Sequence, residues 1–266
     1  MRFGIGKGIG RMSVRMRSGS KPAILLIHGF GCSKESFTGI FRSPLFKGHT
    51  LIAPDLPGFG DSAPPKNKHP TLLLHANACL ALLNRLGIAK THIVGHSMGG
   101  AVSLLLIRKI KSRALSFSSL EGNLIASDCT FSRAVAQYSA KGFKRAGFRE
   151  FRLLTAKDKD KSTRTYWSKT FGKSDANTAY CSAKSLVKLS CSNKLLRMFL
   201  NLKIPKAYFY GQRNAGIEVL KCLKNRVRTR KIPASGHFMM LDNHESFYPQ
   251  LYSFIESSED SHIPAK

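Results

Sequence analysis

Short apolar runs alternate with longer amphipathic stretches along most of the chain, and this alternation predicts strands separated by helices. The helix over residues 71–86 has Pro70 before it and Gly87 after it, which are typical start and stop signals. This order is typical of a mostly parallel sheet covered by helices on both faces, so we predict an α/β fold. The predicted strands are 23–27, 50–53, 91–94, 114–120, 207–210 and 227–232, and the predicted helices are 33–41, 71–86, 98–110 and 245–255.

The alternation stops between Gly122 and about Leu202. This stretch has helical character and no good strand, and it contains 16 basic and 5 acidic residues. Loops longer than ~12–15 residues are uncommon in compact domains, so we predict a helical module at 122–202, inserted between two strands of the sheet. Residues 12–121 and 203–258 would then form the core. We expect residues 1–11, which are rich in glycine and contain no acid, to be a disordered basic tail, and 259–266 to be a second tail.

The chain carries 43 lysines and arginines against 15 acidic residues, a net charge of +28 over 266 residues. Such a charge would suit nucleic acid, an anionic membrane surface or an acidic substrate. However, the basic residues are spread along the chain, and no nucleic-acid module or basic patch with interleaved aromatic residues is present. We therefore expect a solvated basic surface with only a weak attraction to anionic surfaces, and no nucleic-acid partner.

The apolar stretches are all much shorter than the ~20 residues that a membrane span needs. The basic N-terminal segment is not followed by the apolar run of a signal peptide. The six cysteines show neither a Cys-x-x-Cys pair nor a metal-ligand spacing. We therefore expect a cytoplasmic protein with free thiols, without a metal and without a cofactor.

Residues 95–100 read Gly-His-Ser-Met-Gly-Gly and lie between a predicted strand and a predicted helix. The pattern Gly-x-Ser-x-Gly in this context is typical of a nucleophile elbow, a sharp turn that exposes a serine hydroxyl. Because Gly95 and Gly99 lack a Cβ, the strand and the helix beside the turn can approach closely. Ser97 is therefore the candidate nucleophile.

A serine hydroxyl is too weak an acid to attack unaided, so an imidazole must accept its proton. His237 is the best candidate base, because it lies in a Ser-Gly-His-Phe loop after the last predicted strand and follows Ser97 in the chain. His28 and His96 are expected to pack or to form local hydrogen bonds.

Four motifs, in this order, resemble those of the α/β-hydrolase family, in its serine hydrolase or esterase branch. They are His-Gly-Phe-Gly at 28–31, Pro-Asp-Leu-Pro-Gly-Phe-Gly-Asp-Ser at 54–62, the elbow at 95–100, and Ser-Gly-His-Phe at 235–238. The resemblance implies an eight-stranded, mostly parallel sheet with a helical cap inserted after the sixth strand, where residues 122–202 fall. The N-terminal segment looks too short and glycine-rich for the first two strands in full, so we expect truncated strands there, one of them over 12–17.

The resemblance also implies backbone roles and an acid. The N–H groups of Phe30 and Met98 would bind the oxyanion that forms on the substrate. The family's commonest acid position lies in the loop after the seventh strand, where this chain has Asn214. Some branches place the acid at the end of the sixth strand, where Glu121 follows residues 114–120 and would face the ligand crevice. We favour Glu121, with Asn214 and Glu218 as the alternatives.

These residues predict a serine hydrolase that cleaves a carboxylic ester or a similar acyl compound through an acyl-enzyme intermediate. The alternatives are a carbon–carbon bond, amide or lactone hydrolase of the same fold, or a ligand-binding protein on a hydrolase scaffold. The lysines and arginines of the inserted segment would favour an acidic acyl chain or a phosphorylated head group. Asp55 and Asp61 are expected to form local hydrogen bonds in a turn. An apolar acyl pocket is expected from the aromatic residues Phe131, Tyr138, Phe143, Phe148, Tyr166 and Trp167.

Overall fold

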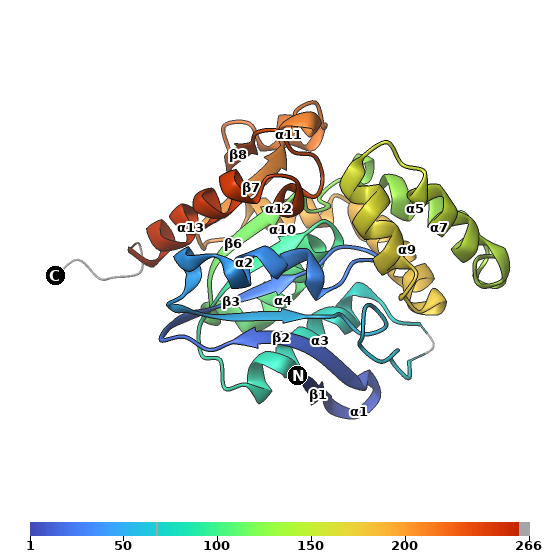
Figure 1. The fold of residues 1–266 in the computed structure, drawn as a ribbon, viewed down its shortest axis with the longest axis horizontal. Helices are drawn as coiled ribbons and strands as arrows, with labels where there is room; N and C mark the ends of the chain where they lie inside the picture. Colours follow the sequence, from blue (N-terminus) through green and yellow to red (C-terminus); the bar gives the residue numbers. More distant parts are fainter. Residues whose placement is uncertain (68, 261–266) are drawn as a thin grey trace.

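The computed structural model describes residues 1–67 and 69–260. Its centre is an eight-stranded sheet with the strand order β1-β2-β4-β3-β5-β6-β7-β8 (Figure 1). Strand β2 is antiparallel to both β1 and β4, and all strands from β4 to β8 in this order are parallel. The predicted mostly parallel sheet is therefore confirmed. The strands are β1 (Arg2–Gly4), β2 (Arg11–Arg17), β3 (Lys21–Ile27), β4 (His49–Pro54), β5 (Thr91–His96), β6 (Ala114–Leu120), β7 (Lys206–Gly211) and β8 (Arg228–Ile232).

Helices flank the sheet on both faces. In Figure 1, α2 (Thr38–Arg42) and α13 (His244–Asp260) lie in front of the sheet, and α3 (Leu72–Arg85) and α4 (Met98–Ile110) lie behind it. Shorter helical turns connect these elements to the strands. They are α1 (Gly6–Ile9), η1 (Lys34–Phe37), η2 (Pro44–Phe46), η3 (Lys111–Arg113), η7 (Gln212–Asn214), α11 (Val219–Leu223) and α12 (Met239–Asp242).

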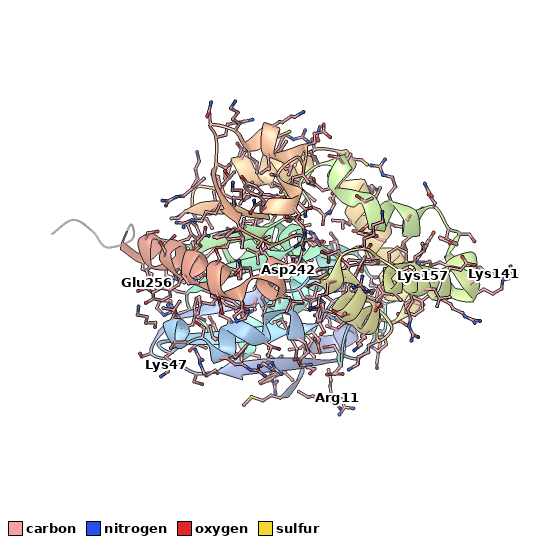
Figure 2. The ribbon with its side chains drawn as sticks, turned by 45° about the horizontal axis from the view of Figure 1, so that its top comes forward. Arg11, Lys47, Lys141, Lys157, Asp242 and Glu256 are labelled. Atoms are coloured by element: carbon pink, nitrogen blue, oxygen red, sulfur yellow. The ribbon has the colours of Figure 1, made fainter. Side chains whose placement is uncertain are left out.

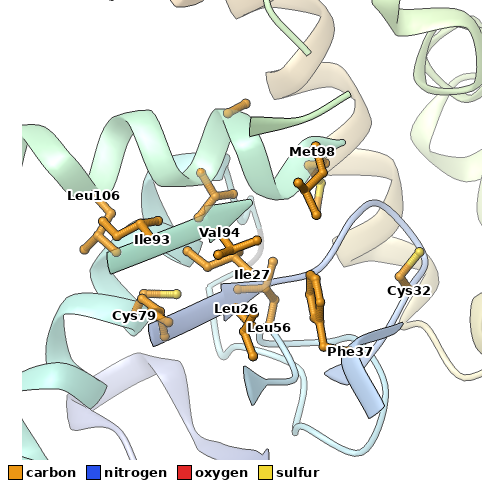
Figure 3. Close-up of a cluster of buried hydrophobic side chains, with 14 of the residues drawn as sticks. Leu26, Ile27, Cys32, Phe37, Leu56, Cys79, Ile93, Val94, Met98 and Leu106 are labelled. Carbon is orange, nitrogen blue, oxygen red and sulfur yellow. The ribbon is translucent and has the colours of Figure 1, made fainter. Parts of the chain in front are cut away.

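The central strands are apolar on both faces because helices cover both. All four residues from Ile24 to Ile27 in β3 are fully buried, as are Ile93 and Val94 in β5. Figure 3 shows these strands between Met98 and Leu106 of α4 on one side and Phe37 and Leu56 on the other. The same layers therefore bury the core and hold the start of α4 against the ends of β3 and β5.

Residues 122–202, which we call the helical insertion, connect β6 to β7. Its helices α5, α7 and α9 form a group beside the sheet (Figure 1), whereas α10 packs against α4. Phe30, in the loop after β3, packs edge-to-face on Phe151 and Phe171 of the insertion. The insertion therefore covers the loops at the carboxyl ends of the strands. Its elements are η4 (Ala126–Cys129), α5 (Thr130–Ala136), α6 (Ala140–Gly142), η5 (Phe143–Gly147), α7 (Phe148–Ala156), η6 (Thr163–Trp167), α8 (Ser168–Phe171), α9 (Ala176–Cys191) and α10 (Lys194–Leu200).

The N-terminal segment differs from the expected disordered tail. Strand β1 pairs with β2 through Arg2 opposite Ser13, and Ile5 is buried in the core. A three-residue edge strand is held by backbone hydrogen bonds to its neighbour, so the alternating glycines gave no local sign of it. Strand β2 includes the strand expected over 12–17, and both N-terminal strands are present, with β1 the short one. At the other end, α13 extends to Asp260, and residues 261–266 of the expected tail lie outside the described residues.

The cysteines are free thiols, as expected from the sequence, and basic side chains lie on the surface. All six thiols are free, and burial raises the pKa of the Cys79 thiol to about 12. The labelled cations Arg11, Lys47 and Lys141 lie on the outline of the molecule (Figure 2). Among the described residues, no helix is both long enough and apolar enough to cross a membrane.

Candidate active site

Sheet register places Ser97 and Glu121 at the same edge. His96, the last residue of β5, pairs with Leu120, the last residue of β6, and Leu120 pairs with Phe209 of β7. The ladder continues one residue further, because Ser97 N–H donates to the Leu120 carbonyl at 3.0 Å and Glu121 N–H donates to the Phe209 carbonyl at 2.9 Å. Ligands of open parallel sheets bind at this carboxyl edge. Both candidate residues therefore face the crevice where a ligand would bind.

The turn at Ser97 has the strained geometry that the sequence motif predicts. Its φ is 53° and its ψ is −122°, a conformation that residues other than glycine rarely adopt, and α4 begins at the next residue. A Cβ on Gly99 would overlap the Ile27 carbonyl and lie 2.6 Å from the His28 oxygen. A Cβ on Gly95 would lie 2.7 Å from the Gly99 carbonyl oxygen. The two glycines therefore allow the helix to start against the strand ends.

The Glu121 side chain lies under His237 and accepts four hydrogen bonds. Its Oε2 is 2.8 Å from His237 Nδ1 and accepts from Asn214 Nδ2 at 2.8 Å. Its Oε1 accepts from Gly211 N–H at 2.8 Å and from the same Asn214 amide at 3.0 Å. The carboxylate is 6% exposed, which makes these contacts more effective than they would be in water. Of the three acid candidates, the structure brings Glu121 to the imidazole and leaves Glu218 exposed.

Asn214, the alternative acid position, contacts the Glu121 carboxylate and not the His237 imidazole. Its amide nitrogen donates to both oxygens of Glu121. Glu121 itself has a φ of +41°, so its backbone is strained in the same sense as that of Ser97. The loop after β7 therefore provides hydrogen-bond donors, and the end of β6 provides the negative charge.

His96 contacts His237 through a hydrogen bond and through ring packing. Its Nε2 is 2.9 Å from the His237 carbonyl oxygen, and the two rings lie 4.6 Å apart between centroids. Since a carbonyl only accepts, Nε2 carries the proton. Burial, followed by the neighbouring His237, lowers the pKa of His96 well below its ordinary value, which favours the neutral ring. This agrees with the local role expected for His96.

The Ser97 hydroxyl donates to Asn123 Oδ1 at 3.4 Å. Within the described residues, this is the one hydrogen bond that the hydroxyl forms. Asn123 N–H in turn donates to the Ser97 carbonyl at 3.3 Å. Sequence reasoning missed Asn123. The available signal was its place two residues after Glu121, directly beyond the end of a strand.

The loop at 28–31 lies against the elbow. A Cβ on Gly29 would lie 3.0 Å from Ser97 Cβ and 2.9 Å from His96 Nδ1, so the backbone before Phe30 touches the nucleophile turn. Trp167 Nε1 donates to the Phe30 carbonyl at 2.6 Å and ties this loop to the helical insertion. Phe30 borders the cavity, while the Met98 side chain is fully buried beneath the turn.

A cavity of about 510 Å³ opens above these residues and includes Ser97, Glu121, Asn214 and His237 in its lining. Two of the six aromatic residues expected in an acyl pocket, Phe131 and Trp167, border it. The other four pack elsewhere: Phe143 is fully buried among Tyr138, Phe148 and Tyr180, and the Tyr166 hydroxyl bonds to Ser33 and Ser36. Tyr138, Phe143 and Phe148 thus pack within the insertion, and Tyr166 ties it to the core. The sequence pattern could not distinguish these packing roles from lining of the cavity. The other aromatic residues around the cavity are Phe30, Tyr208 and Phe238.

Asp55 and Asp61 form the local contacts expected of them. Lys34 Nζ pairs with Asp55 Oδ2 at 2.6 Å and with Asp61 Oδ2 at 2.8 Å, and Asp61 N–H also donates to Asp55. Asp55 is fully buried. His28 is buried beside them, where its Nε2 accepts from Leu56 N–H at 2.9 Å and burial lowers its pKa. These residues fix the loops after β3 and β4.

One cluster with possible metal ligands lies at the opposite edge, where β4 begins. Ligand atoms of His49, Glu256 and Glu259 come within 4.8 Å of one another. However, the Lys21 ammonium binds both oxygens of Glu256, at 2.9 and 2.6 Å. The Lys21 ammonium already balances the charge of Glu256, so these three side chains are not a favourable site for a metal ion.

Comparison with known proteins gives a family and a set of similar folds. Residues 22–244 match the family model described as alpha/beta hydrolase fold. The N-acyl homoserine lactonase AidH, solved in complex with N-butanoyl homoserine, has a TM-score of 0.78 at 18% identity, over 100% of this chain and 98% of that one. A putative aryl esterase from Burkholderia cenocepacia has a TM-score of 0.75 at 18% identity, over 98% and 100% of the two chains.

Sequence relatives match over a shorter stretch. Lipase 3 of Moraxella sp. is 41% identical over 87 residues, which is 32% of this chain and 27% of the lipase. The match to an uncharacterized protein of Mycobacterium tuberculosis is 42% over 87 residues, 33% of this chain and 25% of that protein. The chain thus matches only about a quarter of the length of these curated relatives. With the family model covering most of the chain and the sheet order described above, this protein belongs to the alpha/beta hydrolase fold family.

Proposed function

We propose that this protein is a serine hydrolase that cleaves a carboxylic ester or a similar acyl compound through an acyl-enzyme intermediate. One observation carries the proposal: a buried Glu121 carboxylate 2.8 Å from His237 Nδ1, in the same cavity as a serine on a strained elbow. A hydrolase is what the family and the esterase and lipase neighbours support. The serine mechanism and the ester substrate are the proposed part.

In the proposed reaction, the Ser97 hydroxyl leaves Asn123 by rotating about its side-chain bond and donates to His237 Nε2. Hydrogen bonds of this kind are often long in a free enzyme and shorten only when substrate is bound. As Ser97 Oγ attacks the carbonyl carbon, His237 takes its proton, and the N–H groups of Phe30 and Met98 would bind the oxyanion. His237 then protonates the leaving alcohol, which departs as the acyl-enzyme forms. A water molecule, deprotonated by His237, releases the acid and regenerates Ser97.

Glu121 has two roles in this scheme. Its contact with Nδ1 keeps the proton on that nitrogen, so Nε2 is free to accept from Ser97. Its negative charge stabilises the imidazolium that forms during the attack. The Asn214 amide and Gly211 N–H hold the carboxylate in place by donating to it. An amide at 214 carries no charge, which favours Glu121 as the acid.

One observation favours the alternative, a ligand-binding protein on this scaffold. The Ser97 hydroxyl is bonded to Asn123 at 3.4 Å, not to His237. If the hydroxyl stays bonded to Asn123 when a ligand binds, His237 cannot activate the serine. The cavity would then bind the ligand without cleaving it.

Turnover of p-nitrophenyl acetate and p-nitrophenyl butyrate by the wild-type protein and by Ser97→Ala tests the proposal. We expect hydrolysis by the wild type and loss of at least about 1,000-fold in kcat for the variant, because the nucleophile supplies the covalent path. A fluorophosphonate probe should label the wild type on the tryptic peptide that contains Ser97. Equal rates for the two proteins, together with no labelling, would favour the binding protein.

A further inference from the structure

The charge around the cavity is opposite to that of the whole molecule. Five of the chain's 15 acidic residues border this cavity, whereas Arg213 is its one lining lysine or arginine among residues 1–67 and 69–260. None of the basic residues of the helical insertion borders it. The expectation that these basic residues select an acidic acyl chain is therefore wrong for this cavity. The five acidic residues are Glu121, Asp128, Asp158, Asp160 and Glu218.

The Arg213 guanidinium at the cavity already has carboxylate partners. Arg213 Nη2 pairs with Asp160 at 2.8 Å and with Asp242 at 2.7 Å. Asp160 belongs to the cavity lining and Asp242 lies outside it, so the arginine is paired with carboxylates on both sides. A substrate carboxylate or phosphate would have to compete with both for the same guanidinium. Arg213 is therefore poorly placed to recognise an anion.

Three of the remaining carboxylates have no basic partner. Asp128, Asp158 and Glu218 form no ion pair with a lysine or arginine within residues 1–67 and 69–260. Asp128 is held by the N–H groups of Leu124 and Ile125. Burial, with a smaller contribution from the charges of Glu121 and Glu218, raises the pKa of Asp128 to about 6, although the hydrogen bonds from Leu124 and Ile125 lower it. Asp128 is thus close enough to Glu121 and Glu218 for their charges to repel its own, and a positive charge between them would relieve that repulsion.

Aromatic faces border the same space. Phe131 and Trp167 pack edge-to-face with 4.7 Å between their centroids, and Phe131 is 42% exposed. Aromatic faces attract ammonium and quaternary ammonium groups, and carboxylates beside them add to this attraction. Arg164 lies near this acidic lining, because its Nη1 donates to the Asp158 carbonyl at 2.8 Å, but neither it nor Lys157 nor Lys159 borders the cavity.

We propose that this cavity selects acyl substrates that carry a positively charged nitrogen, through the carboxylates of Asp158 and Glu218 and the ring of Phe131. The inference rests on the proposed hydrolase function and adds a substrate class to it. Neutral esters remain substrates with lower specificity, and anionic esters are turned over least. The positive charge acts in binding, so the preference is expected mainly in KM.

The test compares thioesters of nearly equal shape with different charge. Butyrylthiocholine is compared with its uncharged carbon isostere, 3,3-dimethylbutyl thiobutyrate, and with an S-butyryl mercaptocarboxylate, using thiol release as the readout. A second series places the trimethylammonium group on the acyl chain. In at least one series we expect kcat/KM to be about tenfold higher for the cationic ester than for its isostere, which corresponds to one exposed ion pair and one ring contact. The preference should shrink at 0.5 M NaCl.

Variants assign the preference to residues. The double variant Asp158→Asn/Glu218→Gln, and separately Phe131→Leu, should lower the ratio of kcat/KM on the cationic ester to kcat/KM on its neutral isostere by several-fold. Glu245→Gln, at an exposed acid outside the cavity, is the matched control and should keep the full preference. Serine-dependent turnover of neutral esters without any cationic preference in either series would overturn this inference alone. No turnover of any ester would overturn both it and the proposed function.

Discussion

Replacing Glu121 with glutamine changes the charge of the proposed acid while keeping its length and volume. One oxygen of the new amide can still accept from His237 Nδ1. The amide nitrogen would then face Asn214 Nδ2 or Gly211 N–H, which are donors themselves. The variant therefore loses both the negative charge and part of the hydrogen bonding that orients the side chain.

The size of the effect follows from the geometry. In the transition state His237 is an imidazolium whose Nδ1 lies 2.8 Å from a Glu121 oxygen, so the two charge centres are about 4 Å apart. At an effective dielectric constant of ~20, such a pair contributes about 4 kcal/mol. Since each 1.36 kcal/mol corresponds to a factor of ten in rate, we expect kcat to fall by about 1,000-fold. KM should change little, because the imidazolium exists only in the transition state.

The assay is steady-state hydrolysis of p-nitrophenyl butyrate, with circular dichroism to establish that the variant is folded. Glu245→Gln serves as the control for loss of an acid elsewhere and should keep wild-type kcat. The double variant Glu121→Gln/Asn214→Asp returns a negative charge to the loop after β7, beside residue 121, and should recover tenfold or more of the lost rate. The reasoning is refuted if Glu121→Gln keeps kcat within about threefold of wild type while Ser97→Ala is inactive.

Three further predictions concern the surrounding structure. Asp55→Ala leaves the buried ammonium of Lys34 without its 2.6 Å partner and should lower the free energy of unfolding by about 3 kcal/mol. The more exposed Asp61→Ala should cost less than about 1 kcal/mol, and equal denaturation midpoints for the two variants would contradict this. Burial raises the folded-state pKa of Asp128 to about 6, above its ordinary 3.8, so the folded protein binds this proton more tightly than the unfolded chain does. The contribution of Asp128 to stability is therefore fully present below pH ~4 and is lost as the pH rises to ~6. Relative to Asp128→Asn, the wild type should lose up to about 3 kcal/mol over this range, measured by urea unfolding, and a constant difference would show that the pKa is not raised. Gly99→Ala should destabilise the protein by about 1–3 kcal/mol and reduce turnover, because its Cβ would lie 2.6 Å from the His28 carbonyl oxygen; unchanged stability and activity would show that the turn can relax.

Local patterns predicted the elements that have a clear period. The helix expected over 98–110 and the strand expected over 114–120 match α4 and β6 in the structure, and the other predicted strands differ from theirs by at most two residues at an end. The central ones, such as β3, β5 and α4, are largely apolar because they lie between layers, so burial leaves a direct mark on their composition. The helix expected over 33–41 forms instead as a 3-10 turn, η1, followed by the short α2. Strand β1 was missed, because pairing through the backbone requires no particular side chains.

Sequence by itself determined the candidate nucleophile, the candidate base and the class of fold, because each is marked by neighbouring residues: the glycines around Ser97, the loop around His237, and the alternating apolar runs. Only the tertiary structure decided which acid meets the imidazole. Glu121 and His237 are 116 residues apart, and their contact depends on the register that aligns Leu120 with Phe209 and on the donors at Gly211 and Asn214. The acidic lining of the cavity was likewise decided by the fold. Net charge is a sum over the chain, whereas a bound substrate meets only the few side chains that long-range packing brings around it.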